Sequence, residues 1–386
     1  MYACYAITAP GLEGLTAAEL AALGATVGAS EPGGVAFDAA PGILYAANLR
    51  LRTASRLVVR AATFHAANFA ELERHAARVA WGRWVPEGGA VHFRVTSRKS
   101  RLYHQDAVAE RLEKAVLAAV PGARAVRAPS EADALDDDVT SPPGVQRFIV
   151  RLVHDELTLS ADSSGALLHR RGYRLATGKA PLRETLAAAM LLAVGWDGST
   201  PLVDPMAGSG TIPIEAALLA RRIPPGWRRR FAFEGWPEFK ASVWEFVRNE
   251  AGKEMLDRAS GPIVAADRDA GAVEACGANA ARAGVAEGLA IRCAPLSATL
   301  ADPALAAWPA GVVVTNPPFG VRVGATRPLR DLYAALGNAM RGPLASWGLA
   351  FVTSEPALAG ATGLPLEPLI QTTTGGLPIR LYARRP

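Results

Sequence analysis

The chain has few of the residues on which metal sites and disulfide frameworks depend. Its 386 residues include three cysteines, Cys4, Cys276 and Cys293, and six histidines. No His-x-x-x-His or Cys-x-x-Cys spacing occurs among them, although such spacings are typical of zinc ligands. We therefore expect no metal and no disulfide, and we interpret the three thiols as buried side chains.

Long hydrophobic runs are also missing. Half of the residues are apolar, yet no run approaches the ~20 residues needed to cross a bilayer, and the N-terminus lacks a charged region followed by a long apolar one. The sequence predicts a soluble, cytoplasmic protein. Its length exceeds what one hydrophobic core usually organises, so two or three domains are expected.

The excess of positive charge is small, because 41 Lys and Arg residues stand against 36 Asp and Glu and give +5. The sequence pI of about 9.3 and the clustering of arginines nevertheless permit a nucleic-acid partner. The three clusters are Arg98, Lys99 and Arg101, then Arg170 and Arg171, then Arg228, Arg229 and Arg230. Each also has a plainer interpretation: the first could be a solvated loop, the second a linker, and the third a lid packed on the domain.

Residues 1–65 predict a small α+β module. Apolar residues recur at helical spacing over Thr16–Leu23, and we expect Thr16 to cap this helix while Glu19 completes a capping box. The strand candidates are Tyr2–Thr8, Val35–Phe37 and Leu57–Ala62.

Residues 66–162 predict a second α+β module. The basic segment Ser97–Arg101, followed by Tyr103 and His104, leads into a predicted helix, a position that favours phosphate contact. Residues 128–144 contain three consecutive aspartates and are expected to form an exposed loop. The predicted helices are Phe69–Val79 and Gln105–Val120, and the predicted strands are Val91–Thr96, Phe148–Val153 and Leu157–Ala161.

Residues 163–195 predict a linker and a connecting helix over Lys179–Val194, with Pro181 tolerated in its first turn. From residue 196 to 386 strands and helices alternate, which is typical of a doubly wound parallel sheet. The predicted strands are Pro201–Val203, Ile263–Asp267, Leu289–Cys293, Val312–Val314, Leu349–Thr353 and Ile379–Ala383, and the predicted helices are Ile214–Ala220 and Ala270–Ala283.

The first two of these strands are followed by polar and glycine residues suited to a ligand. Gly208 and Gly210 would let a ligand approach the backbone at a helix N-terminus, although Pro213 replaces the third glycine of a dinucleotide fingerprint. Asp267 ends the second strand, where a carboxylate can accept both hydroxyls of a ribose. The plainer interpretations are a helix cap for Asp204 and a turn for Asp267.

Val312–Gly320 combines a short buried strand with the turn Asn-Pro-Pro-Phe-Gly. Pro317 holds Asn316 out of the helical region, and the two prolines offer carbonyls but no N–H groups. The Asn316 amide oxygen and the Pro317 carbonyl could therefore accept both hydrogens of an amino group on a flat base, while Phe319 stacks on the ring. An ordinary strand-ending turn is the alternative.

The order of these three features resembles the class I S-adenosylmethionine-dependent amino-methyltransferases. Three further segments, Leu168–Tyr173, Ala180–Ala189 and Ile223–Trp236, are similar to the THUMP-domain RNA guanine-N2 methyltransferases, closest to the branch that modifies 23S rRNA. The resemblance implies a Rossmann-like domain with a seven-stranded, mostly parallel sheet over 196–386. A ferredoxin-like module over 1–65 and a THUMP RNA-binding domain over 66–162 would precede it.

The resemblance also implies S-adenosylmethionine as cofactor and RNA as partner, with rRNA favoured over tRNA. One departure from the family pattern is that Cys293–Ser297 contains no acid near the adenine position, which leaves the adenine contacts unassigned. The implied cofactor residues are Asp204, Met206, Gly208, Gly210, Thr211 and Asp267, the implied guanine-binding residues are Asn316, Pro317 and Phe319, and the three basic clusters are the implied RNA contacts.

Other functions stay open at this point. The same turn serves methyltransferases that act on tRNA guanine, DNA adenine or protein glutamine, and a non-catalytic RNA-binding protein could keep the cofactor fold. The basic and aromatic residues of Trp227–Phe233 next to the site favour RNA, with arginines on phosphates and rings stacked on unpaired bases.

Overall fold

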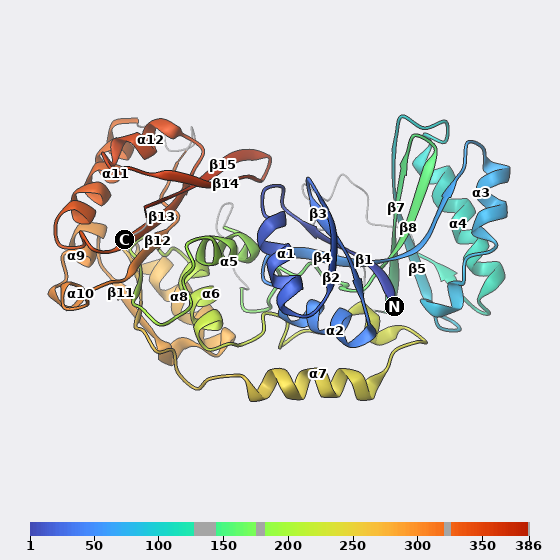
Figure 1. Ribbon diagram of the computed structural model, residues 1–386, viewed down its shortest axis with the longest axis horizontal. Coiled ribbons are helices and arrows are strands. Elements are labelled where there is room, and N and C mark those ends of the chain that lie inside the picture. Colours follow the sequence, from blue (N-terminus) through green and yellow to red (C-terminus); the bar gives the residue numbers. More distant parts are fainter. Residues whose placement is uncertain (127–143, 175–181, 320–325, 385–386) are drawn as a thin grey trace. The chain divides into compact units, whose positions relative to one another are not determined.

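The structure is a computed structural model that describes residues 1–126, 144–174, 182–319 and 326–384 (Figure 1). The chain forms two compact units that exchange short segments. Unit 1 comprises Met1–Thr8, Ala17–Leu168 and Arg229–Asn249, and unit 2 comprises Ala9–Thr16, His169–Arg228 and Glu250–Pro386. Neither unit is therefore one continuous stretch of sequence.

Unit 1 is built on a single eight-stranded sheet in the order β2-β3-β1-β4-β8-β7-β5-β6. The strands of both predicted N-terminal modules belong to it, because β4 from the first pairs antiparallel with β8 from the second. In sheet order the strands are Thr26–Glu31, Gly34–Ala39, Tyr2–Thr8, Ala54–His65, Glu156–Asp162, Val145–Val153, Ala90–Arg98 and Arg124–Ala125.

Alternating burial along these strands gives the sheet one apolar face. Phe93, Phe148 and Ala161 lie opposite one another on β5, β7 and β8 and are all buried. Trp81 crosses the Phe148 ring edge to face, with ring centroids 5.2 Å apart. Helices α3 (Phe69–Ala76) and α4 (Gln105–Ala119) cover this face, as Figure 1 shows.

The first predicted helix is present but its predicted cap is wrong. Helix α1 spans Glu13–Ala22, so Thr16 lies inside it and donates its hydroxyl to the Leu12 carbonyl. Glu19 does not close a capping box, because its carboxylate accepts hydrogen bonds from the Arg52 and Thr53 backbone N–H groups. The sequence analysis also missed β2 and helix α2 (Pro41–Arg50).

Unit 2 contains the predicted seven-stranded, mostly parallel sheet, in the order β11-β10-β9-β12-β13-β15-β14. Four pairings are parallel, and β15 joins β13 and β14 antiparallel. In sheet order the strands are Leu289–Cys293, Ile263–Asp267, Leu202–Asp204, Val312–Thr315, Gly348–Thr353, Leu377–Arg384 and Glu367–Thr374.

The central strands of this sheet are apolar on both sides because helices cover both faces. Val312 and Val314 pack into one hydrophobic cluster, whereas Val313 packs into the other. Helices α5 (Glu184–Ala193), α6 (Thr211–Ala220) and α8 (Ala270–Ala283) contribute to the first cluster. Helix α11 (Thr326–Arg341) contributes to the second.

The strand order creates one place where a ligand can reach the sheet. From β9 the chain proceeds through β10 to β11 on one side, and then returns to β12 on the other side of β9. In open parallel sheets such a switch point opens a crevice at the carboxyl ends of the strands. The loops after β9 and β12, at Asp204 and Asn316, both begin at this crevice.

Candidate active site

The loop after β9 is shaped by two glycines. Gly208 and Gly210 have positive φ angles of 53° and 89°, which side chains other than glycine rarely adopt. A Cβ atom on Gly210 would stand 2.5 Å from the Cys276 sulfur atom, so only glycine lets this loop pack on α8. The loop delivers Thr211 to the first position of α6, three residues before the predicted helix start at Ile214.

Asp204 lies at the bottom of the crevice and is 1% exposed. Its Oδ1 accepts hydrogen bonds from the Met206 backbone N–H at 3.1 Å and the Thr315 hydroxyl at 2.7 Å. Burial raises the pKa of Asp204 to about 7; the charge of Asp267 adds to this rise, while the two hydrogen bonds oppose it. The alternative interpretation of Asp204 as a helix cap does not hold, because Gly210 occupies the cap position of α6.

Asp267 ends β10 and holds the glycine loop in place. Its Oδ2 accepts a hydrogen bond from the Gly208 N–H at 2.9 Å, and its Oδ1 accepts one from the Asp269 N–H at 3.0 Å. Each carboxylate oxygen has a second lone pair. Both oxygens can therefore still accept hydroxyl groups, and the ribose contact stays a prediction.

Asn316 directly follows β12, and its side chain carries an unused acceptor. The Oδ1 atom is buried and has no hydrogen-bond partner among the described residues. Pro317 is buried, and the half-buried Phe319 packs against both hydrophobic clusters of unit 2. Because buried polar atoms nearly always have a partner, the orphaned oxygen points to a ligand with an N–H group.

Thr315 links the two halves of the site and was missed by the sequence analysis. It is fully buried as the last residue of β12, and its hydroxyl donates to Asp204 on the neighbouring strand. The turn at Asn316 and the loop that begins at Asp204 are therefore joined by one hydrogen bond. The signal available in the sequence was a polar residue at the end of an otherwise apolar strand.

Two further polar side chains support the glycine loop. Asn279 on α8 donates to the Ser209 carbonyl at 2.9 Å. Arg174 donates to the Thr211 hydroxyl at 2.7 Å and lies 3.5 Å from the Glu184 carboxylate. The loop geometry is thus held from three sides, which pre-forms a cradle for a ligand.

Of the first basic cluster, Arg98 and Lys99 are exposed at the end of β5 before α4, as predicted. Arg101 is exposed but lies 3.8 Å from the Asp155 carboxylate. Tyr103 is 67% exposed and its ring lies 4.2 Å from that of His104. The phosphate-contact role of this loop stays a prediction.

The second cluster divides into an exposed and a buried arginine. Arg170 is exposed, whereas Arg171 is buried and lies 3.6 Å from the buried Glu215 carboxylate. Tyr173 donates its hydroxyl to the same carboxylate. The predicted RNA contact of Arg171 is therefore wrong, because its charge is used inside unit 2.

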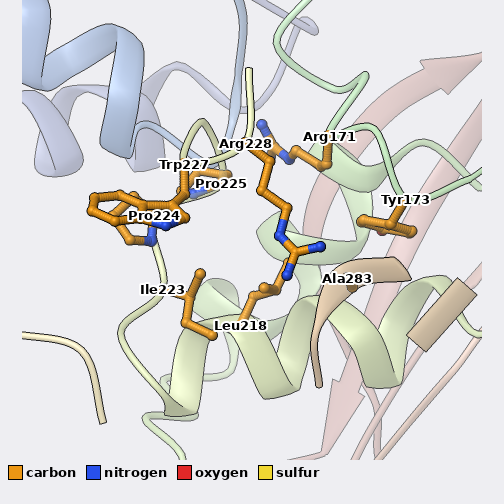
Figure 2. A pocket seen from close by; sticks show the side chains of 9 residues that line it. All are labelled: Arg171, Tyr173, Leu218, Ile223, Pro224, Pro225, Trp227, Arg228 and Ala283. Carbon is orange, nitrogen blue, oxygen red and sulfur yellow. The ribbon is translucent and has the colours of Figure 1, made fainter. Parts of the chain in front are cut away.

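Figure 2 shows a pocket that Arg171 lines together with Tyr173, Trp227 and Arg228. Leu218 and Ala283, near the ends of α6 and α8, also line it. These helices run back from the carboxyl ends of the strands they follow, so their own ends lie at the opposite edge of the sheet. The pocket is therefore separate from the crevice at Asp204 and Asn316.

The third cluster is largely structural. Arg228 donates to the Arg282 carbonyl, and Arg229 donates to the carbonyls of Leu167 and Ala166. Arg230 is different, because its side chain is 92% exposed and lies 3.7 Å from the Glu234 carboxylate. The RNA contact stays a prediction for Arg230.

Two rings of this segment, those of Phe231 and Phe233, cannot stack on RNA bases. Phe231 and Phe233 are buried, and Phe233 stacks on Tyr45 with centroids 4.3 Å apart. The buried Trp236 donates its indole N–H to the Gln146 amide oxygen. The base-stacking interpretation of Phe231 and Phe233 is corrected to a packing role within unit 1.

Several expectations concern groups outside the crevice. Cys4 and Cys276 are buried as predicted, but Cys293 is exposed at the end of β11. The described residues include no cluster of side chains able to hold a metal ion. Among the same residues, no helix is long and apolar enough to cross a membrane.

Comparison with known proteins shows to which family the chain belongs. A family model described as "RMKL-like, methyltransferase domain" matches residues 171–365. The chain belongs to the RMKL-like methyltransferase family. A second model, "RlmL ferredoxin-like domain", matches residues 3–58, which confirms the ferredoxin-like module. The THUMP identity of residues 66–162 stays a prediction.

Relatives of this RMKL-like chain are similar over nearly its whole length. The "Ribosomal RNA large subunit methyltransferase K/L" of Syntrophotalea carbinolica is 36% identical over 392 residues, which cover 97% of this chain and 52% of that protein. The chain thus spans about half the length of the K/L relatives it matches.

Two solved structures share the complete RMKL-like fold. SMU.472, crystallised in complex with S-adenosylhomocysteine, has a TM-score of 0.85 at 28% identity, covering 100% of this chain and 98% of that one. A Listeria monocytogenes protein described as a predicted N6-adenine-specific DNA methylase has a TM-score of 0.84 at 31% identity, covering 100% and 96%. These matches confirm the Rossmann-like methyltransferase fold expected from the sequence.

Proposed function

We propose that this RMKL-like chain transfers a methyl group from S-adenosylmethionine to the exocyclic N2 amino group of a guanine in structured RNA, with 23S rRNA as the substrate. The observation that carries the proposal is the buried, unpartnered Oδ1 of Asn316 at the switch point of the sheet. An oxygen in that state accepts one hydrogen from an amino group, and the adjacent Pro317 carbonyl accepts the other.

The residues after β9 and β10 fit the cofactor. The positive-φ glycines keep the loop free of side chains where a ligand approaches the N-terminus of α6. Asp267 keeps free lone pairs for ribose hydroxyls. Asp204 has no cationic partner among the described residues, so the ammonium group of the methionine moiety would stabilise its carboxylate.

The chemistry asks little of the protein beyond placement. The cofactor supplies a methyl group that is already activated on sulfur. Asn316 and Pro317 hold the amine in line with that methyl group and draw its nitrogen toward tetrahedral geometry, which exposes the lone pair. Phe319 offers its ring to the base. The hydrogen bond between Thr315 and Asp204 keeps these two halves in register.

RNA as the substrate is supported by the name of the Syntrophotalea carbinolica relative and by the ferredoxin-like module. Guanine is supported by the resemblance of residues 168–173, 180–189 and 223–236 to the guanine-N2 enzymes. Transfer to the N6 amine of adenine in DNA is the second candidate, favoured by the description of the Listeria monocytogenes structure. Both bases present an amine that the Asn316 turn could hold.

The deciding experiment is to incubate the protein with labelled S-adenosylmethionine and separate pools of undermethylated rRNA, tRNA and DNA. Nucleoside mass spectrometry then identifies the methylated atom. We expect N2-methylguanosine from the rRNA pool alone. N6-methyladenine from DNA would establish the second candidate, and label in no pool, with cofactor binding intact, would contradict transfer to a nucleic acid.

A further inference from the structure

One face of the unit 1 sheet carries arginines where a packed sheet carries apolar residues. Helices cover the face that holds Phe93 and Phe148, and the opposite side chains of β4, β8, β7 and β5 form what we call the open face. Its arginines that are exposed or half-buried are Arg60, Arg94, Arg98 and Arg151.

Strand register places these arginines on one surface. Arg94, Ile149, Ser160 and Arg60 lie opposite one another across the four strands. The next row contains Thr96, Arg151 and Thr158. Neighbouring strands are about 4.8 Å apart, so Arg94 and Arg60 stand about 14 Å apart, with Arg151 between them and one row along.

The charge of the open face is available to a partner. Arg60, Arg98 and Arg151 are exposed, and Arg98 and Arg151 form no ion pair with another described residue. Arg60 lies over the Tyr5 ring, 5.2 Å from its centroid, which leaves its charge unneutralised. Elsewhere in unit 1, Arg83 and Arg111 lie within 4 Å of the carboxylates of Glu238 and Glu73.

Among the residues that the structure describes, acids on this face are few and lie at its limits. Asp162 is fully buried and is used by the buried Arg56. Glu156 lies at the start of β8 and is opposite His65 on β4. A solvated surface without a partner usually mixes the two signs of charge, whereas the centre of the open face, among the described residues, exposes arginines, hydroxyl groups and the half-buried Ile149.

We propose that the open face docks the sugar–phosphate backbone of the substrate RNA. The inference rests on the proposed function, since it requires RNA as the substrate, and it extends that function by naming the surface that positions the RNA. Arginine forks bind phosphate oxygens in pairs of hydrogen bonds, and the threonine hydroxyls between them are further phosphate or ribose partners.

The open face is suited to bind the sugar–phosphate backbone of RNA rather than its bases. The exposed large aromatic residues of the described chain, Tyr103, Phe246 and Trp308, lie outside it, and its own Tyr5 is half-buried beneath Arg60. Without stacking rings or amide side chains the surface recognises phosphate spacing, not sequence. Arg98 is the last residue of β5, and the basic residues Lys99 and Arg101 follow it, so this loop continues the same basic surface.

The test is a triple variant, Arg60→Gln, Arg98→Gln and Arg151→Gln, compared with a charge-matched control. The control, Arg74→Gln, Arg78→Gln and Lys114→Gln, removes three exposed cations from the α3 and α4 side of unit 1. The measurements are the affinity for an rRNA fragment over a range of salt concentrations, the affinity for S-adenosylmethionine, and the methyl-transfer rate at saturating RNA.

We expect the open-face variant to bind RNA at least tenfold more weakly and to lower the slope of log affinity against log salt by about two to three, because each lost phosphate contact removes nearly one released counterion. Cofactor affinity and the rate at saturating RNA should stay unchanged. An unchanged slope, or an equal loss in the control, would overturn the docking surface while leaving methyl transfer intact. Absence of RNA methylation by the wild-type protein would instead contradict the proposed function.

Discussion

The turn after β12 and the segment after α6 both contain residues suited to ligand binding, but they use these residues differently. The turn after β12 leaves a buried acceptor on Asn316 without a partner, whereas the segment after α6 uses its arginines and rings inside the protein. Arg229 donates to two backbone carbonyls and Phe233 stacks on Tyr45. The turn therefore keeps an acceptor that a ligand can use, whereas residues of suitable chemical type do not by themselves indicate a site.

The largest effect is expected for Asn316→Ala. Loss of the acceptor should lower the methyl-transfer rate by about 10²–10³-fold, the usual cost of removing one preorganised transition-state hydrogen bond. Cofactor and RNA affinities should survive, as equilibrium titrations would show. Asn316→Asp keeps an oxygen acceptor and should recover part of the rate. Near-normal turnover in the alanine variant would disprove the amine-holding role.

Asp204→Asn should weaken S-adenosylmethionine binding by roughly 10–100-fold, because the ammonium group loses its carboxylate partner. The same change should stabilise the protein at pH 8. The pKa of Asp204 lies above its unfolded value, so folding loses stability as pH rises from about 4 to 7. Calorimetry at pH 8 should therefore show a higher unfolding midpoint, whereas Asp257→Asn, a change at an exposed carboxyl group, should alter neither property.

The pH dependence of cofactor affinity follows from the same carboxyl group. Below pH 7, binding must remove the proton from Asp204, so affinity should fall about tenfold per pH unit between pH 7 and 5.5. Isothermal titration in buffers of different ionisation enthalpy would detect the released proton. A flat profile in the wild type would place the ammonium group elsewhere, and Asp204→Asn should abolish the dependence.

Arg229 and Arg230 are neighbours in the segment after α6, but we expect their loss to have different effects on stability. Arg229→Ala should lower the unfolding free energy by about 2 kcal/mol, because it removes charged hydrogen bonds to buried carbonyls. Denaturant titration would measure this loss.

Arg230→Ala should change stability by less than about 0.5 kcal/mol, because its side chain is mostly exposed. If Arg230 contacts RNA, its loss should lower the salt slope of RNA affinity by about one. Equal destabilisation by both variants would contradict a structural role for Arg229 and a surface role for Arg230.

The sequence was most informative about residues whose position in the site depends on backbone geometry alone. Val312–Thr315 is a short apolar run, and parallel strands bring their carboxyl ends to one edge, so Asn316, Asp204 and Asp267 could be placed together. The side-chain partners could not be predicted. The hydrogen bond from Thr315 to Asp204 depends on which strands are neighbours.

Helix α11 and strand β14 were not predicted, because contacts with distant parts of the chain decide their structure. Helix α11 contains Gly337, which lowers helix propensity, yet a Cβ atom there would lie 1.9 Å from the Thr362 carbonyl oxygen. Strand β14 contains Pro368 beside a register shift, a pattern that argues against a strand in sequence alone. Arg229 looked like a ligand contact because nothing local identifies the carbonyls of residues 166 and 167 as its partners.

The assignment of Arg229–Asn249 to unit 1 constrains how the chain can be divided for expression. A fragment beginning at residue 163 would carry Phe233 and Trp236 without Tyr45 and Trp84, whose rings lie 4.3 and 4.8 Å away from them. Those apolar rings would then meet water, a recognised cause of aggregation. Fragments of the methyltransferase unit should therefore replace residues 229–249 with a short polar linker.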